Sequence, residues 1–331
     1  MTENFNPLVS IVIPVYNGSN YMREAIDSAL AQTYKNIEVL VINDGSNDNG
    51  ATREIALNYG EKIRYFEKEN GGVASALNLG IREMKGEYFS WLSHDDIYMP
   101  DKVEKQVNLL KESGNYESII FSDWISIDEA GNKLEEFDLS TIIPYQIEYY
   151  LLLQQVIHGC TLLIPRIAFN KSGNFPENLP TTQDYTLWLR LSENFSFFHC
   201  KKALVFSRHH KSQGSLLLQH TTEVNDFFKC ELKRMNAEKI NKLFPAGDRF
   251  EACDNLAQSL IDRGYNDCAQ MFVLQVIDMF PVHERRLLSL NIDYSQLQAN
   301  YSQLQATHTA LINNRIIRVL NKMRRILGKE A

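Results

Sequence analysis

Strand-like and helix-like segments alternate four times within the first 100 residues, and this alternation constrains the fold most strongly. Short apolar runs rich in β-branched residues predict strands, and apolar residues at helical spacing predict the helices between them. The strands are expected at 9–17, 37–46, 63–72 and 87–96, and the helices at 21–33, 50–60 and 73–85. Such alternation is typical of an α/β fold with a mostly parallel sheet flanked by helices.

A polar turn follows each predicted strand. The turns are Asn17-Gly18, Asn43-Asp44-Gly45-Ser46, Asn70-Gly71-Gly72 and Asp95-Asp96. In an open parallel sheet, ligands bind outside the carboxyl ends of the strands. We therefore expect these four turns to meet at one edge of the sheet and to form the ligand site.

The pattern changes beyond residue 100. A strand and a hairpin are predicted over 118–134, helices over 145–158 and 183–193, and a strand over 195–210. From about residue 221 the pattern is helical. We predict a sheet-containing domain over 1–220, a helical region over 221–290 and a C-terminal segment over 291–331.

Charge and cysteine content limit the classes of function. The 331-residue chain has a formal net charge of -7, which argues against a nucleic-acid binder. Its five cysteines are scattered without a C-x-x-C pair, a pattern typical of reduced thiols in a cytosolic protein. We find neither the layout of a signal peptide nor an apolar run near the roughly 18 residues of a membrane-spanning helix. A cytoplasmic protein is expected.

The C-terminal segment carries two helical patterns. Residues 287–311 contain the repeat YSQLQAN–YSQLQAT, whose apolar spacing predicts a coiled-coil helix that could form a homo-oligomer, or else an ordinary surface helix. Residues 314–329 place apolar side chains on one helical face with basic side chains beside it. Such a helix binds an anionic membrane surface or packs on a partner protein. Peripheral attachment to the inner face of the membrane is therefore one expectation.

The familiar glycine-rich nucleotide motifs are missing from the sequence. Neither G-x-x-x-x-G-K-[ST] nor G-x-G-x-x-G after the first strand occurs. A bound phosphate would then be held by a metal ion, and Asp95-Asp96 suits Mg²⁺ or Mn²⁺, which prefer carboxylate oxygens. The alternative is that one of these aspartates caps the following helix.

Five sequence blocks in a fixed order resemble a known family. They are VSIVIPVYNGSNYMREAIDSALAQTYKNIEVLVINDGSND, ENGGVASALNLGI, HDDIYMPDKV, QDYTLWLRL and SRHHKSQGS. Together they cover about residues 8–215 and resemble a family 2 glycosyltransferase of the GT-A fold, a Rossmann-like α/β class. Nothing after residue 220 takes part in the resemblance.

The resemblance implies a pocket for a nucleotide-sugar. Pro14, Tyr16 and Asp44 would hold the nucleobase and ribose, and the aromatic face of Tyr16 suits stacking on a base. Asn70 and Asn78 would line the same pocket. The alternatives are a packing role for Tyr16 and turn or helix-cap roles for the asparagines.

The resemblance also implies a divalent metal site. Asp96 would be the direct ligand, and Asp95 would lie toward the ribose or the metal shell. His210 would lie near the metal and the diphosphate, with His209 as the rival candidate. The family motif often has a further aspartate where this chain has Ser93.

A general base is implied at Asp184, in the pair Gln183-Asp184, where the family usually has Glu before the Asp. Direct displacement at the anomeric carbon needs a group that removes the proton of the acceptor hydroxyl. One carboxylate suffices, and the anomeric configuration inverts. The alternative role for Asp184 is a cap of the predicted helix that follows.

These expectations describe an inverting, metal-dependent glycosyltransferase that takes a UDP-sugar most readily. The acceptor would be a surface glycan or a lipid-linked saccharide of the cell envelope, in polysaccharide biosynthesis. Two alternatives stay open. A sugar nucleotidyltransferase would need a Gly-rich, Lys- or Arg-bearing loop after the first strand, which is not found. A glycosyltransferase-like binding or assembly subunit would be consistent with Ser93 and Gln183.

Overall fold

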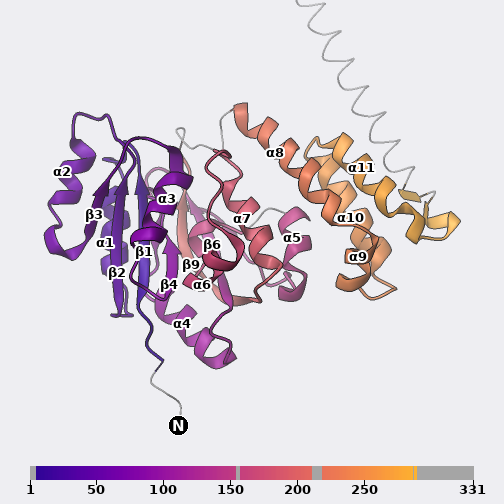
Figure 1. The fold of residues 1–331 in the computed structure, drawn as a ribbon, viewed down its shortest axis with the longest axis horizontal. Helices are drawn as coiled ribbons and strands as arrows, with labels where there is room; N and C mark the ends of the chain where they lie inside the picture. Colours follow the sequence, from indigo (N-terminus) through magenta and orange to yellow (C-terminus); the bar gives the residue numbers. More distant parts are fainter. Residues whose placement is uncertain (1–4, 154–156, 211–217, 286, 289–331) are drawn as a thin grey trace, which may run out of the picture. The chain divides into compact units, whose positions relative to one another are not determined.

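The computed structural model in Figure 1 describes residues 5–153, 157–210, 218–285 and 287–288. The chain divides into two compact units, residues 1–228 and 229–331, and the division falls inside helix α8 (Leu218–Glu231). The boundaries predicted for the three regions 1–220, 221–290 and 291–331 stay predictions.

The first unit contains the predicted parallel sheet, with the strand order β3-β2-β1-β4-β8 (Figure 1). The strands β1 (Val9–Val15), β2 (Ile37–Asn43), β3 (Arg64–Glu67) and β4 (Tyr88–Trp91) run parallel to one another. The short β8 (Ile164–Pro165) adds an antiparallel edge beside β4. Every residue of β1 is buried, as expected for a central strand covered on both faces.

The connections between these strands are helical, as the periodicity predicted. They are α1 (Met22–Leu30), α2 (Ala51–Leu57) with the 3₁₀ turn η1 (Gly60–Lys62), and α3 (Gly72–Glu83). Helix α3 packs against β1 and β2. A Cβ on Gly80 would lie 2.3 Å from a methyl of Val12, so glycine permits this close approach.

A second, four-stranded sheet has the order β5-β9-β6-β7. Strand β6 (Ile119–Ile127) pairs in parallel with β9 (Phe197–Arg208) and forms the predicted hairpin with β7 (Lys133–Phe137). Gly131 in the hairpin turn has φ +87°, a conformation that favours glycine. Strand β5 (Ile97–Tyr98) pairs antiparallel with β9, and helix α4 (Lys102–Ser113) follows it. Two-residue strands such as β5 and β8 carry no periodicity, and neither was predicted.

The remaining segments of the first unit are mostly short helices. They are η2 (Pro144–Gln146), α5 (Ile147–Leu153), η3 (Gly159–Thr161), α6 (Arg166–Ser172) and α7 (Gln183–Ser192). Helix α7 packs against α5 and α6. Its inward face carries Leu187, Trp188 and Leu191, each fully buried.

The described residues of the second unit are helical, in agreement with the sequence pattern. They form η5 (Leu232–Arg234), α9 (Ala237–Leu243), α10 (Arg249–Asp262), α11 (Asn266–Val276) and η6 (Ile277–Met279). Helices α10 and α11 pack against each other, and both carry buried apolar faces. None of the helices in the described ranges is long and apolar enough to cross a bilayer. Apart from Leu287 and Leu288, the predicted coiled-coil segment 287–311 and the basic segment 314–329 lie outside the described residues.

Candidate active site

A cavity of about 600 Å³ lies at the carboxyl ends of the parallel strands. Its lining comes from the end of β1, from the turns after β2, β3 and β4, from His158, from residues 180–183 and from the end of β9. Most of the side chains predicted for the site lie on it: Pro14, Tyr16, Asp44, Asn70, Asp95, Asp96 and His210. The fold thus brings these turns to one place.

The end of β1 forms one wall of this cavity. Tyr16 is 44% exposed although it lines the cavity, so its ring can meet a planar ligand. The next residue, Asn17, has φ +50° and exchanges two side-chain hydrogen bonds with Asn47. These bonds hold the turn that presents Tyr16.

Asp44 is buried at the end of β2, and its charge is compensated. Its Oδ1 accepts a hydrogen bond from Lys68 Nζ at 2.7 Å, and its Oδ2 accepts one from the main-chain N–H of Gly72 at 2.7 Å. Asn70 donates from its side chain to the main-chain oxygen of Asp44 at 3.0 Å. The turns after β2 and β3 therefore form one hydrogen-bonded unit, and sequence reasoning missed Lys68.

Asn78 is not among the residues that line the cavity. Its side-chain amide donates to the main-chain oxygen of Phe175 and to Glu177, and its Oδ1 accepts from the N–H of Phe175. The side chain fastens the 175–177 loop to α3. Its polar atoms are therefore engaged in the fold.

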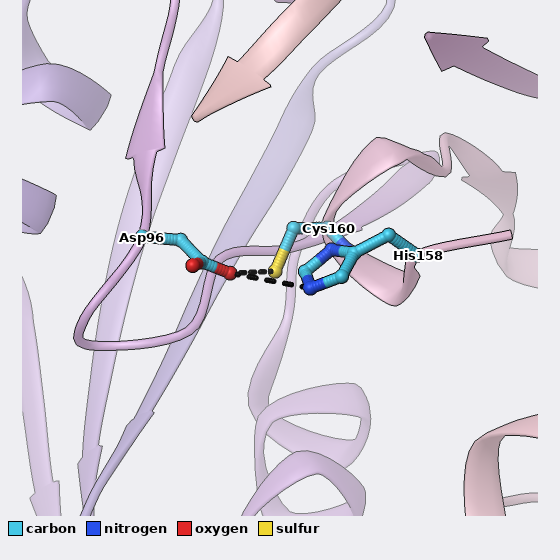
Figure 2. A group of neighbouring side chains, drawn as sticks. All are labelled: Asp96, His158 and Cys160. Atoms are coloured by element: carbon cyan, nitrogen blue, oxygen red, sulfur yellow. Dashed lines mark hydrogen bonds and ion pairs between the residues drawn. The ribbon is translucent and has the colours of Figure 1, made fainter. Parts of the chain in front are cut away.

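Asp95 and Asp96 occupy the turn between β4 and β5. Asp96 is 3% exposed; its Oδ1 accepts from the main-chain N–H of Arg208 at 2.9 Å. Its Oδ2 accepts from the thiol of Cys160 at 3.2 Å (Figure 2). Burial and the neighbouring charge of Asp95 raise the pKa of Asp96 to about 8. Asp95 Oδ2 lies 2.8 Å from His210 Nε2, which supports the choice of His210 for this end of the site.

Arg208 holds the aspartate turn in place. Its guanidinium donates to Glu24 Oε2 at 2.7 Å and to the main-chain oxygens of Asp95 and Glu129, each at 3.0 Å. It also lies over the Tyr21 ring, 4.6 Å from the ring centre. Arg208 is 2% exposed, and its position in the motif RHH gave no sign of this role.

The donor set fits a divalent cation. Two adjacent carboxylates and an imidazole face one end of the cavity, and carboxylate oxygens are the ligands that Mg²⁺ and Mn²⁺ prefer. A cation beside Asp96 would also offset the cost of its buried charge, which the raised pKa reports. The residues present are thus compatible with the predicted metal.

Two further histidines line the cavity. Burial lowers the pKa of His94, and a Cβ on Gly18 would lie 2.5 Å from the His94 ring, so glycine lets this ring pack under the first turn. His158 lies with its Nε2 3.6 Å from Asp96 Oδ2. Neither His158 nor Cys160 was predicted, because nothing in the local pattern of 157–161 links these residues to the aspartates far earlier in the chain.

The start of α7 supplies the opposite wall. Gln183 lines the cavity at 5% exposure, and within the described part of the chain its Oε1 has no hydrogen-bond partner. Asp184 is not among the lining residues; its Oδ1 accepts from the adjacent N–H of Tyr185 at 2.8 Å. Burial raises the pKa of Asp184 to about 6.

The structure also bears on the alternative role of Asp184 as a helix cap. The N-cap of α7 is Thr182, and Glu223 of α8 accepts hydrogen bonds from the N–H groups of Thr181 and Thr182. Glu223 thus fixes the residues just before the helix, whereas the first-turn N–H of Tyr185 is satisfied by Asp184 itself. Asp184 lies in the first turn, where a negative charge is favoured, and is not the cap itself.

Comparisons with known proteins support the sequence resemblance. A family described as "Glycosyl transferase family 2" matches residues 10–171. An "Uncharacterized glycosyltransferase" of Rickettsia typhi is 52% identical over 278 residues, covering 80% of this chain and 84% of the relative. Another, of Rickettsia felis, is 52% identical over 241 residues, covering 72% of this chain and 40% of the relative. The chain thus spans about two fifths of the length of the latter.

A more distant relative and a solved structure extend the comparison. The chondroitin synthase of Pasteurella multocida is 30% identical over 258 residues, covering 76% of this chain and 25% of the relative. The crystal structure of S. aureus TarS 1-349 in complex with UDP-GlcNAc matches with a TM-score of 0.61 and 17% identity, covering 89% of this chain and 92% of that chain. The structural likeness confirms the predicted GT-A fold class.

Proposed function

Because the chain belongs to glycosyltransferase family 2, we propose that it transfers a sugar from a nucleotide-sugar to an acceptor hydroxyl group, with inversion at the anomeric carbon. The observation that carries this proposal is the Asp95-Asp96 pair, of which Asp96 is buried, in one cavity with Tyr16 and Asp44. The ring of Tyr16 would meet the base of a nucleoside diphosphate. Asp44 would lie near its ribose, and the Asp95-Asp96 pair would hold a cation at its diphosphate. The complex of TarS with UDP-GlcNAc supports a UDP-sugar as the donor.

The donor would lie with its base against the exposed ring of Tyr16. Asp44 already accepts hydrogen bonds from Lys68, Gly71 and Gly72, so a ribose hydroxyl would have to share its oxygens with these donors. Because Lys68 fixes the carboxylate before the donor arrives, little ordering is needed on binding. Asn70 stiffens the same turn.

The diphosphate end would meet Asp95, Asp96 and His210. A divalent cation, Mg²⁺ or Mn²⁺, held by these three side chains would offset the charge that develops on the leaving diphosphate. Arg208 keeps the main chain of the aspartate turn in place, and His210 orients Asp95. These residues give the two carboxylates a fixed direction at low exposure.

Asp184 is the proposed general base. With a pKa of about 6 it is mostly ionised at pH 7, yet still basic enough to take a proton from a hydroxyl group as the new bond forms. Its first-turn position places it beside Gln183, which lines the cavity. The acceptor supplies the nucleophile, so no covalent intermediate with the protein is needed.

We further propose that the acceptor is a surface glycan or a lipid-linked saccharide, in polysaccharide biosynthesis for the cell envelope. The basic pattern of 314–329 supports attachment to the inner face of the membrane, and the heptad pattern of 287–311 supports a homo-oligomer. Both of these proposals rest on the sequence alone. Co-sedimentation with anionic liposomes, lost when residues 312–331 are removed, tests the first.

The central test measures nucleotide release from UDP-, GDP- and dTDP-sugars with Mn²⁺, Mg²⁺ or EDTA. We expect metal-dependent turnover of one donor, lost in Asp96→Ala and in Asp184→Asn. Asp226→Asn, on an exposed position of α8, is the matched control and should keep wild-type turnover. If no donor turns over and calorimetry shows no metal-linked nucleotide binding, the binding or assembly subunit replaces this proposal.

A further inference from the structure

A second set of donor atoms meets at Asp96. Cys160 Sγ lies 3.2 Å and His158 Nε2 lies 3.6 Å from the same carboxylate oxygen, Oδ2, and the three donor atoms all lie within 4.8 Å of one another (Figure 2). Figure 2 shows the three side chains pointing toward one another from two separate segments of the chain. Bonds of about 2.0–2.3 Å to zinc place tetrahedral ligand atoms roughly 3–4 Å apart. An ion therefore fits between these atoms with little movement of the backbone.

The fold holds His158 and Cys160 against the aspartate turn through Gly159. A Cβ at Gly159 would lie 2.4 Å from the ring of Trp91, so only glycine lets the 3₁₀ turn η3 pack flat on the end of β4. The same strand leads into the turn that carries Asp96. His158 and Cys160 thus reach Asp96 because a glycine separates them.

The chemistry of this triad differs from that of the neighbouring carboxylate pair. Thiolate, imidazole and carboxylate together suit Zn²⁺ and Co²⁺, whereas Mg²⁺ and Mn²⁺ prefer oxygen ligands. Asp96 and His158 line the cavity, while Cys160 is fully buried behind them. Three protein ligands leave a fourth position for water or a ligand oxygen.

Binding has three local costs. The hydrogen bond between His158 Nε2 and Ser207 Oγ, at 3.2 Å, is lost when this nitrogen binds the metal. The thiol of Cys160 must release its proton, as in any thiolate–metal bond. His158 Nδ1 accepts a hydrogen bond from the N–H of Cys160 at 3.3 Å, and this bond is lost when the ring binds metal through Nε2. A bond of that length is weak, and a zinc–nitrogen bond replaces it.

We propose that Asp96, His158 and Cys160 form a site for Zn²⁺ or a chemically similar ion, and that its occupancy competes with the catalytic cation for Asp96. The binding itself is independent of the proposed glycosyl transfer. Only the competition rests on that function. A cation with high thiolate affinity would thereby act as an inhibitor.

The test is a titration of the metal-free, full-length protein with Co²⁺, whose d–d and thiolate-to-cobalt charge-transfer absorption reports ligation. We expect one bound ion with a charge-transfer band, displaced by Zn²⁺ and retained in excess Mg²⁺. Cys160→Ser should remove the band, and His158→Gln should weaken Co²⁺ binding at least tenfold. Cys253→Ser, at a buried cysteine of the second unit, is the matched control and should keep both.

A missing band, or a band that survives in Cys160→Ser, overturns the site. Thermal melts check that each variant folds. If Cys160→Ser does not fold, His158→Gln still tests the site. In turnover assays Zn²⁺ should inhibit the wild type, and His158→Gln should need at least tenfold more Zn²⁺ for the same inhibition. If the protein binds Co²⁺ but Zn²⁺ does not inhibit turnover, only the proposed competition is wrong. If it binds Co²⁺ but shows no turnover, the result contradicts the proposed function and not the metal site.

Discussion

Asp44 and Asp96 are both buried acids that follow strands of the same parallel sheet and line the same cavity. Asp44 is neutralised by the fold itself. The ammonium group of Lys68 and the main-chain N–H of Gly72 each donate to its carboxylate at 2.7 Å. Such charge-assisted bonds stabilise a buried carboxylate and fix its direction.

Asp96 is held differently. Its donors are a main-chain N–H from Arg208, the thiol of Cys160 and the hydroxyl of Ser207, and all three are neutral. In the described ranges, no lysine or arginine side chain forms an ion pair with it. The two acids therefore differ: a protein ammonium group neutralises Asp44, whereas the described residues supply no lysine or arginine partner for Asp96, which is consistent with the proposed cation.

The largest effect expected from this contrast is on activity. Asp96→Asn should lower turnover of the donor by roughly 100- to 1,000-fold, since the cation that would stabilise the leaving group loses a carboxylate ligand. The same variant should melt at the wild-type temperature or above it. Because the folded-state pKa of Asp96 is raised from 3.8 to about 8, this carboxyl lowers stability as pH rises between these values, with the full cost present above 8, and an amide carries no such cost.

Turnover assays and thermal melts at pH 7 and pH 9 check this pair of outcomes. The gain in melting temperature should be larger at pH 9. Loss of stability in Asp96→Asn at both pH values would contradict the contrast, because it would show that the protein already neutralises this carboxylate.

Asp44 should behave in the opposite way. Asp44→Asn leaves Lys68 without its partner and removes one of the acceptors of the α3 turn, so it should lower the free energy of unfolding by about 1–3 kcal/mol. Urea denaturation measures the change. Lys68→Met should cost a similar amount, and the double variant should cost less than the sum of the two. Additive costs would show that the two side chains do not act as a pair.

The smallest expected effect is on the pH dependence of kcat/KM. It adds a third acid, Asp184, to the comparison of Asp44 with Asp96. Asp184 has its pKa raised to about 6 by burial, so kcat/KM should rise with pH through about 6 as the base ionises and then level off. Asp184→Asn should lose activity and melt no lower than the wild type at pH 8, because it removes a buried charge. A profile flat from pH 5 to pH 8 would remove Asp184 from the role of base.

Local pattern predicted much of the fold and one side of the site. The apolar runs that became β1, β2 and β4 can each be read from local sequence, and parallel pairing brings their ends together without further information. For that reason the turns that carry Asp44, Asp95 and Asp96 were found from their position after strands. The family resemblance, rather than periodicity, supplied Tyr16, His210 and Asp184.

The sequence alone determined the alternation of strands and helices in the first 100 residues, the polar strand ends and the family. Only the tertiary structure decided which of the buried acids has a cationic partner, because that depends on groups from remote segments: Lys68 for Asp44, and Arg208, His158 and Cys160 around Asp96. Secondary-structure periodicity reports which face of an element is buried, and it carries no information on which loop side chains meet across the sheet edge. Long-range packing, such as the close contact of Gly159 with Trp91, sets those meetings.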